Sequence, residues 1–267
     1  MSLLLRLACL CLALLQFLPL LAGPWQASAA ENDALIERLV QAYPDYLTGH
    51  EGNDIIWKDG TRMPFDDDVR NKPFETLLNK PSLRDEFAMA YPKGKPQAES
   101  EENFDPGRIR YQPFFDKMYG DCEKGEVSAK LAAIDWMPKH NGGKIEVTTI
   151  NGIQQKLQAI SGELDNLPDK YMKYLIPSSG VYSCRPIAGT SRKSMHAYAA
   201  AIDINTAHSH YWLWSKDKNG TYKYQNEIPY EIAAIFEKHG FIWGAKWYHF
   251  DTMHFEYRPE ILSPVPE

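Results

Sequence analysis

The sequence lacks the features of several large classes of protein. Lysine and arginine total 29 against 35 aspartates and glutamates, so the net charge of −6 gives none of the basic excess typical of nucleic-acid-binding proteins. No internal repeat is visible along the 267 residues, which argues against solenoids and propellers. The 44% hydrophobic and 24% charged residues lie near the globular average, which excludes a wholly disordered chain, a collagen or a coiled coil.

Long hydrophobic runs are absent after the first 22 residues. Residues 1–30 carry Arg6 as their one charge, then a mostly apolar run, then small residues at 27–30. This order predicts a secretory signal peptide, and therefore an exported protein, periplasmic or secreted. An uncleaved membrane anchor is the alternative, because the apolar run approaches the length of a bilayer span, but Pro19, Pro24 and the small-residue site favour cleavage. We expect no membrane span in the chain that remains after cleavage.

Cysteine is scarce. Two of the four cysteines lie in the predicted signal peptide, which leaves Cys122 and Cys184. An even pair in an oxidising compartment predicts a disulfide, which would close a loop of roughly 60 residues and stabilise the fold by about 4 kcal/mol. Two unrelated buried thiols are the alternative. Two cysteines so far apart do not make a zinc finger.

Hydrophobic periodicity predicts a mixture of helices and short strands. Helices are expected over 34–43 (capped by Asn32 or Asp33), 128–137, 151–164 (capped by Asn151) and 229–239. Strands are expected near 55–57, 144–150, 181–183, 201–204 and 255–257. A hairpin is expected to join 211–215 to 221–224. Residues 92–110, rich in Pro, Gly, Glu and Lys, predict a surface loop. The run 66–68 of three aspartates lacks the spacing of a calcium loop and is interpreted as a solvated turn or helix cap. The pattern predicts an α+β fold, with a small antiparallel sheet backed by helices and an irregular N-terminal portion.

Histidines and aspartates gather in the last third of the chain. His196 and Asp203 are separated by six residues across a turn into a strand, and Asp251 stands three positions before His254. Two imidazoles and one carboxylate leave the fourth position of a tetrahedral zinc ion open for water, as in catalytic sites. A further carboxylate beside the metal can take a proton from water and pass it to a leaving amine. Taken singly, each motif is also common as a surface histidine or a capping aspartate.

The residues around these motifs resemble a known family. The segment 194–203, Ser-Met-His-Ala-Tyr-Ala-Ala-Ala-Ile-Asp, is similar to the S-x-H-x(6)-D segment of the M15 zinc peptidases. That family includes D-alanyl-D-alanine carboxypeptidases, D-Ala-D-Ala dipeptidases and phage endolysin peptidases. Trp243-Gly244 followed by the segment 251–256 resembles the second motif, with its acidic residue three positions before the last histidine. Both motifs stand in the family's order, and the resemblance covers about 180–259 and extends less closely back to Lys144.

The resemblance implies roles for individual residues. One Zn²⁺ ion would be held by His196, Asp203 and His254, with Asp251 as the general base. Arg185 stands in place of an arginine that holds the substrate carboxylate or polarises the scissile carbonyl, a task that suits a planar guanidinium; a salt bridge on a loop is the alternative. Ser194 would contact substrate or orient a ligand.

The resemblance also implies a Hedgehog/DD-peptidase-like fold and a substrate. The catalytic domain would cover 140–267, while 31–139 forms either a domain of its own or a layer over the catalytic one. The substrates implied are peptidoglycan stem peptides, cut at D-Ala-D-Ala by a carboxypeptidase, which we favour, or at L-Ala-D-Glu by an endopeptidase. A non-catalytic, zinc-containing cell-wall-binding domain is an alternative. A serine or cysteine hydrolase is disfavoured, because the sequence has no G-x-S-x-G elbow and the predicted disulfide consumes the thiols.

Several residues near the motifs keep open roles. Glu256 shares a strand face with His254, and it is either a support for that histidine or a surface residue. The family commonly has glycine where this chain has Ala199, which predicts an unstrained backbone there.

The remaining histidines are assigned more loosely. His208 and His210 follow the predicted metal strand and are candidates for lining the cleft. His249 either stabilises a developing oxyanion or is packed or solvated. His50, His140 and His239 lack nearby partners in the sequence and are interpreted as structural.

Overall fold

The computed structural model describes residues 24–96 and 100–262. Most of the predicted signal peptide, residues 1–23, lies outside the described part, so that prediction stays open. Within the described part, no helix combines the length and the hydrophobicity that a membrane crossing requires.

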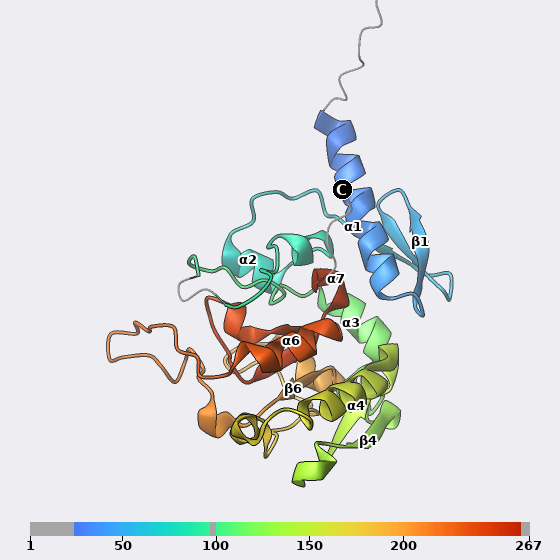
Figure 1. The fold of residues 1–267 in the computed structure, drawn as a ribbon. Helices are drawn as coiled ribbons and strands as arrows, with labels where there is room; N and C mark the ends of the chain where they lie inside the picture. Colours follow the sequence, from blue (N-terminus) through green and yellow to red (C-terminus); the bar gives the residue numbers. More distant parts are fainter. Residues whose placement is uncertain (1–23, 97–99, 263–267) are drawn as a thin grey trace, which may run out of the picture.

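The described chain mixes helices with three small antiparallel sheets, which confirms the α+β class (Figure 1). The helices are α1 (Pro24–Ala42), α2 (Phe74–Asn79), α3 (Gln112–Tyr119), α4 (Ile153–Leu164), α5 (Met172–Leu175), α6 (Tyr230–Lys238) and α7 (Pro259–Leu262). The first sheet contains β1 (Leu47–Glu51), β2 (Asp54–Trp57) and β3 (Arg62–Pro64), and the second contains β4 (Leu131–Asp135) and β5 (Lys144–Thr148). The third has the order β6 (Ala201–Asp203), β8 (His254–Tyr257), β7 (Phe241–Trp243).

The third sheet is fixed by aromatic packing against α6. Phe236 of α6 stacks on Phe255 of β8 with ring centroids 3.9 Å apart, and Trp243 of β7 stacks on the same ring at 5.8 Å. All three side chains are fully buried. Stacked rings of this size bury a large apolar area and hold β8 in one position relative to its neighbours. The strand that begins at His254 is therefore rigidly placed.

Contacts join the N-terminal part of the chain to β8 and α7. Arg258, fully buried just after β8, forms ion pairs with Glu86 at 2.7 Å and with Glu260. Tyr43, directly after α1, donates a hydrogen bond to Glu260 at 2.5 Å. One hydrophobic core runs from Leu35 to Tyr257. The division into 31–139 and 140–267 stays a prediction, but buried charges and a shared core cross it.

Two stretches predicted as helix or hairpin fold differently. Residues 128–137 are not helical: a 3₁₀ turn (Ser128–Lys130) leads into β4, which pairs with β5 through Ile134 and Ile145. Pairing with a partner strand outweighs the helix propensity of the alanines. The predicted hairpin 211–224 is also wrong, because Tyr211 bridges Asp251 instead.

Smaller differences concern strand 181–183 and three caps or turns. No strand forms at 181–183; only Gly180 bridges Asp203. Helix α1 begins well before the predicted cap, and Asn32 instead bonds Asp66 at 3.0 Å. Asp66 is buried and paired with Arg70, so it is not in a solvated turn. Gly152 rather than Asn151 precedes α4.

The other predicted elements are confirmed within a few residues at each end, except at the N-terminal end of α1. The segments 34–43, 151–164 and 229–239 correspond to α1, α4 and α6, and the segments 55–57, 144–150, 201–204 and 255–257 correspond to β2, β5, β6 and β8.

Candidate metal centre

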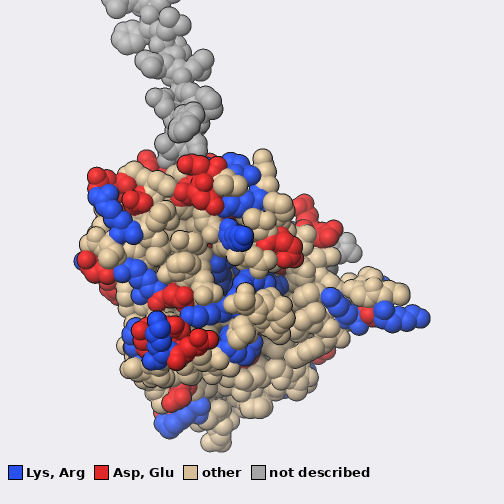
Figure 2. Space-filling view, turned by 180° about the vertical axis from the view of Figure 1, so that it is seen from behind, with Lys and Arg blue, Asp and Glu red and all other residues tan. Residues whose placement is uncertain are grey.

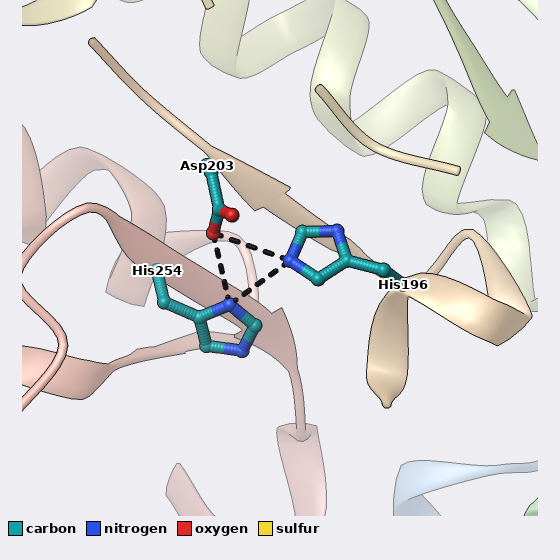
Figure 3. Close-up of side chains that lie close together, drawn as sticks. All are labelled: His196, Asp203 and His254. Carbon is teal, nitrogen blue, oxygen red and sulfur yellow. Dashed lines mark hydrogen bonds and ion pairs between the residues drawn. The ribbon is translucent and has the colours of Figure 1, made fainter. Parts of the chain in front are cut away.

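Three residues from separate parts of the chain point toward one centre (Figure 3). His196 lies on a 3₁₀ helix (Met195–Tyr198), Asp203 ends β6 and His254 begins β8. The Nε2 atom of His196 lies 3.2 Å from both the Nδ1 atom of His254 and the Oδ1 atom of Asp203, and those two atoms are 3.0 Å apart.

Local backbone structure explains how the three side chains meet. Asp203 and His254 are directly paired residues of the antiparallel strands β6 and β8, so their side chains leave the same face of the sheet. Ser194 caps the 3₁₀ helix, because its Oγ accepts a hydrogen bond from the His196 backbone N–H at 3.3 Å. The helix ends at Ala199, after which the chain turns into β6. Ser194 also lines the recess beside the cluster, so its two predicted roles, contacting substrate and orienting a ligand, both stay predictions.

Ala199 departs from the expectation drawn from its side chain. Its φ of 53° lies in the left-handed region that favours glycine, and its side chain is fully buried. The expected unstrained backbone is therefore wrong. The left-handed residue is what ends the 3₁₀ helix and turns the chain toward β6.

Hydrogen bonds on the far side of each imidazole fix its tautomer. The Nδ1–H of His196 donates to the carbonyl oxygen of Val181 at 2.7 Å, and the Nε2–H of His254 donates to the Oε2 of Glu256 at 2.9 Å. Since carbonyl and carboxylate oxygens only accept, the neutral form of each imidazole has its lone pair on the nitrogen that faces the other ring. Metal-binding histidines in proteins are held in this way.

The donor set fits a zinc ion. Two imidazole nitrogens and a carboxylate oxygen at about 2.0–2.1 Å from a tetrahedral ion would lie about 3.3 Å apart, close to the separations observed. The centre also attracts positive charge. Burial lowers the pKa of His254, but hydrogen bonds to Asp203 and Glu256 outweigh it and raise the pKa to about 10. Burial likewise opposes ionisation of Asp203, yet the two histidines hold its pKa well below the usual value.

Asp251 lies beside the cluster without belonging to it. Its Oδ1 atom is buried and has no hydrogen-bond partner among the described residues. Burial, and then the charge of Asp203, raise its pKa to about 6. A carboxyl group in this state can accept and return a proton near neutral pH.

A recess of about 210 Å³ opens onto the cluster. Its wall includes His196, His254, Asp251, Arg185 and Ala188, and we call it the site recess. The guanidinium of Arg185 is exposed and bonds only the carbonyl oxygen of Pro186, at 3.4 Å. Among the described residues it forms no salt bridge, so its charge is available to a ligand.

Glu256 and Arg110 support His254 from behind. Glu256 is fully buried, so it is not the surface residue that the sequence left as an alternative. Arg110 donates to both of its oxygens, with Nε 3.1 Å from Oε1. Burial opposes ionisation of Glu256, but the charge of Arg110 and the hydrogen bond from His254 keep its pKa well below the usual value. The carboxylate that orients His254 is therefore permanently charged.

Arg110 comes from the stretch that the composition assigned to the surface. Within 92–110, Asp105 and Ile109 are buried, so the loop prediction is wrong for its last residues. Arg108 lies over the ring of Trp247 and lines the site recess together with Arg110. The sequence signal that could have indicated these residues is the Arg-x-Arg pattern of Arg108 and Arg110, since residues two apart on an extended chain face the same side.

The other candidate histidines lie away from the centre. His208 packs edge-on against Tyr174, and His210 lies 3.2 Å from Glu227; neither lines the site recess. His249 is packed, bonding Asp105 at 2.6 Å.

The histidines interpreted as lacking partners have acidic neighbours. His140 pairs with Asp165 at 2.8 Å and His239 with Glu163 at 2.7 Å. These partners lie 25 and 76 residues away in the chain, and the interpretation of both histidines as structural stays a prediction. His50 lies 3.8 Å from Asp33.

The structure contains the predicted disulfide between Cys122 and Cys184, with a Cα–Cα distance of 5.6 Å. The alternative of two unrelated thiols is therefore wrong. The bond ties Arg185, the next residue, to the segment that follows α3.

Comparison with known sequences bears on the same region. Residues 188–257 match the sequence model of an M15 peptidase family described as D-alanyl-D-alanine carboxypeptidase. The matched segment contains His196, Asp203, Asp251 and His254 and ends within β8. No curated protein and no solved structure matches the chain. The resemblance to the M15 peptidases is confirmed, and it supports a peptidase.

Proposed function

We propose that this protein, which carries an M15-type peptidase segment at 188–257, is a zinc-dependent hydrolase of peptidoglycan stem peptides. The observation that carries the proposal is the convergence of His196, Asp203 and His254 beside the unpaired carboxylate of Asp251. His196, Asp203 and His254 would hold the zinc. When bound, zinc lowers the pKa of a water molecule to about 7 and polarises a carbonyl oxygen.

The chain's own groups then have distinct tasks. Asp251 accepts a proton from the attacking water and afterwards donates it to the departing amine. The products are a carboxylic acid and a free amine, and Asp251 returns to its starting state. Arg185 binds a carboxylate of the peptide or the oxygen of the scissile carbonyl with its planar fork of donors. Glu256 and the carbonyl of Val181 keep the two imidazoles oriented throughout. The walls of the recess position the peptide.

The bond that we favour is D-Ala-D-Ala, cleaved by carboxypeptidase action. The description of the matched family and the exposed, unpaired guanidinium of Arg185, suited to a terminal carboxylate, support this choice. Endopeptidase cleavage at L-Ala-D-Glu is the second candidate, in which Arg185 would polarise a carbonyl. Digestion of muropeptides followed by mass spectrometry separates them, since the first releases free D-alanine and the second releases cut stems.

The general test combines metal analysis with turnover. The purified protein should bind one zinc ion, His196→Ala should lose it, and Asp251→Asn should keep it while losing about 10²–10⁴-fold in kcat. A zinc-loaded wild-type protein that cleaves no muropeptide would instead support a non-catalytic wall-binding domain. The presence of both Asp251 and Arg185 counts against that alternative.

Two further parts of the proposal concern export and fold. An export signal over 1–30 fits a substrate outside the inner membrane, and sequencing the N-terminus of the exported protein tests it. We also assign 140–267 as a Hedgehog/DD-peptidase-like catalytic domain, preceded by the region 31–139. Superposition of an experimental zinc-bound structure on members of that fold is the corresponding test.

A further inference from the structure

The loop that leads into the cluster carries a second arginine. Pro186 and Lys193 form an isolated bridge, and the N–H of Ile187 donates to the carbonyl oxygen of Arg192 at 2.8 Å. The N–H of Arg192 donates in turn to Oγ1 of Thr190 at 3.2 Å. The loop is held by its own hydrogen bonds, so the backbone of Arg192 is fixed in place.

Arg192 differs from Arg108, Arg110 and Lys193 in having no partner of opposite charge among the described residues; Arg108, for example, lies 3.5 Å from Asp105. Arg110 is paired with Glu256, and Lys193 lies 2.9 Å from Asp116 and 3.1 Å from Asp121. Arg192 forms no ion pair within the described part of the chain, and its Nε atom is buried without a hydrogen-bond partner.

The surroundings of Arg192 favour an added anion. Burial, and then the nearby charges of Arg110 and Arg108, lower the pKa of Arg192, while Glu75 and Asp105 raise it by less. A guanidinium nevertheless remains charged in proteins. A half-buried cation beside two others is costly, and a bound carboxylate would offset that cost through charge-assisted hydrogen bonds.

Arg192 lines a second hollow that adjoins the first. This flanking recess, of about 600 Å³, is walled by Arg192, Phe74, Trp212 and His249 and shares Arg108 and Ala188 with the site recess. Glu75 also lines it, but forms no ion pair with Arg192. Figure 2 shows basic side chains gathered in a central hollow of the face it presents, with acidic ones around them.

We propose that Arg192, with Arg108 beside it, forms a second anion subsite that binds a carboxylate of the peptide substrate remote from the bond that is cut. The inference rests on the proposed function: the two recesses share Arg108 and Ala188 in their walls, so a peptide that extends from the cluster past Ala188 would reach the flanking recess. The planar donor fork of a guanidinium suits a peptide carboxylate. The substrate is therefore an acidic peptide with at least two carboxylates, one at Arg185 and one at Arg192.

A matched pair of substrates tests the subsite in hydrolysis. One is a stem pentapeptide ending in D-Ala-D-Ala whose D-Glu has a free α-carboxylate, and the other carries a carboxamide there. Arg192→Gln should lower kcat/KM for the carboxylate peptide about 10- to 100-fold and leave the carboxamide peptide within about 2-fold of wild type. Arg192→Lys should recover part of the loss.

Lys80→Gln is the matched control. Lys80 is exposed and lines a neighbouring hollow with Arg192 and Arg110, so its removal changes the local charge without touching the subsite. Both peptides should keep their wild-type kcat/KM in this variant. If kcat/KM for the carboxylate peptide fell equally in Lys80→Gln and Arg192→Gln, the effect would be a general electrostatic attraction of the peptide, and the subsite would be overturned.

Binding to the metal-stripped protein separates this inference from the proposed function. By calorimetry, the wild-type protein should bind the carboxylate peptide about 10-fold more tightly than the carboxamide, and Arg192→Gln should bind the two equally. Equal binding by the wild-type protein overturns the subsite even if the zinc enzyme cleaves both peptides. Selective binding without cleavage by the zinc-loaded protein overturns the peptidase and leaves the subsite standing.

Discussion

The Cys122–Cys184 disulfide gives the most quantitative prediction for the fold. Its sequence separation is 62, and closing a loop of that length removes about 14 cal/mol/K from the entropy of the unfolded chain, or about 4 kcal/mol at 25 °C. The double variant Cys122→Ser, Cys184→Ser should therefore be less stable by about 4 kcal/mol. With a urea dependence of about 3 kcal/mol/M, its unfolding midpoint falls by more than about 1 M.

The assay is urea unfolding followed by tryptophan fluorescence, with and without a reducing agent. Reductant should shift the wild-type midpoint toward that of the double variant and leave the double variant unchanged. Because Arg185 follows Cys184 directly, KM should also rise when the bond is absent, with a smaller change in kcat. A midpoint within about 0.3 M of wild type, at equal slope, would refute the loop-entropy reasoning.

Four other predictions follow from single residues. Asp251 must be ionised to accept a proton, and its pKa is about 6 in the metal-free protein, so kcat/KM should fall as the pH drops below about 6. A pH profile that stays flat down to about pH 4 would exclude Asp251 as the base. Glu256→Gln removes the charged acceptor behind His254, so zinc affinity measured by chelator competition should weaken about 10- to 100-fold; unchanged affinity would contradict its orienting role. Arg258→Met leaves buried carboxylates without their counter-charge and should cost about 3–5 kcal/mol in urea unfolding, whereas a stable variant would show that they are protonated or rearrange. Ala199→Gly relieves about 1–2 kcal/mol of left-handed backbone strain. It also loses a buried methyl group worth about 0.8 kcal/mol and gives the unfolded chain about 0.4–1 kcal/mol of additional conformational freedom. The free energy of unfolding should therefore stay within about 1 kcal/mol of the wild-type value, and a larger loss would contradict the strain.

The sequence indicated the centre of the site better than its surroundings. His196 and Asp203 lie close in the chain, and His254 starts a strand whose apolar alternation was visible, so pairing β6 with β8 was enough to bring them together. The support from Arg110 spans 146 residues to Glu256, and no local pattern records such a pairing. The same applies to the packing of His249 against Asp105.

The predicted secondary structure failed where tertiary pairing decided the outcome. Residues 131–135 have helix-forming alanines and become a strand because β5 lies alongside. The segment 211–224 has a hairpin-like Asn-Gly pair, but Tyr211 pairs with Asp251 across the site instead. A single sequence shows the local conformational preference of each segment but not which segment will pack or pair with it. Because a strand forms only when it pairs with a partner, these two errors could not be avoided from the local pattern.

The buried ion pair between Glu86 and Arg258 has a consequence for the inheritance of this protein. The two positions are not equally replaceable. Arg258 faces Glu86, Glu256 and Glu260, so its loss would leave several carboxyl groups in a medium that solvates their charge poorly, whereas loss of Glu86 alone leaves Arg258 paired with Glu260. Burial also raises the pKa of Glu86 to about 8, which lowers the cost of replacing that residue by an uncharged one. Descendants of this gene should therefore retain Arg258 more strictly than Glu86, and a comparison of many natural variants would display that asymmetry.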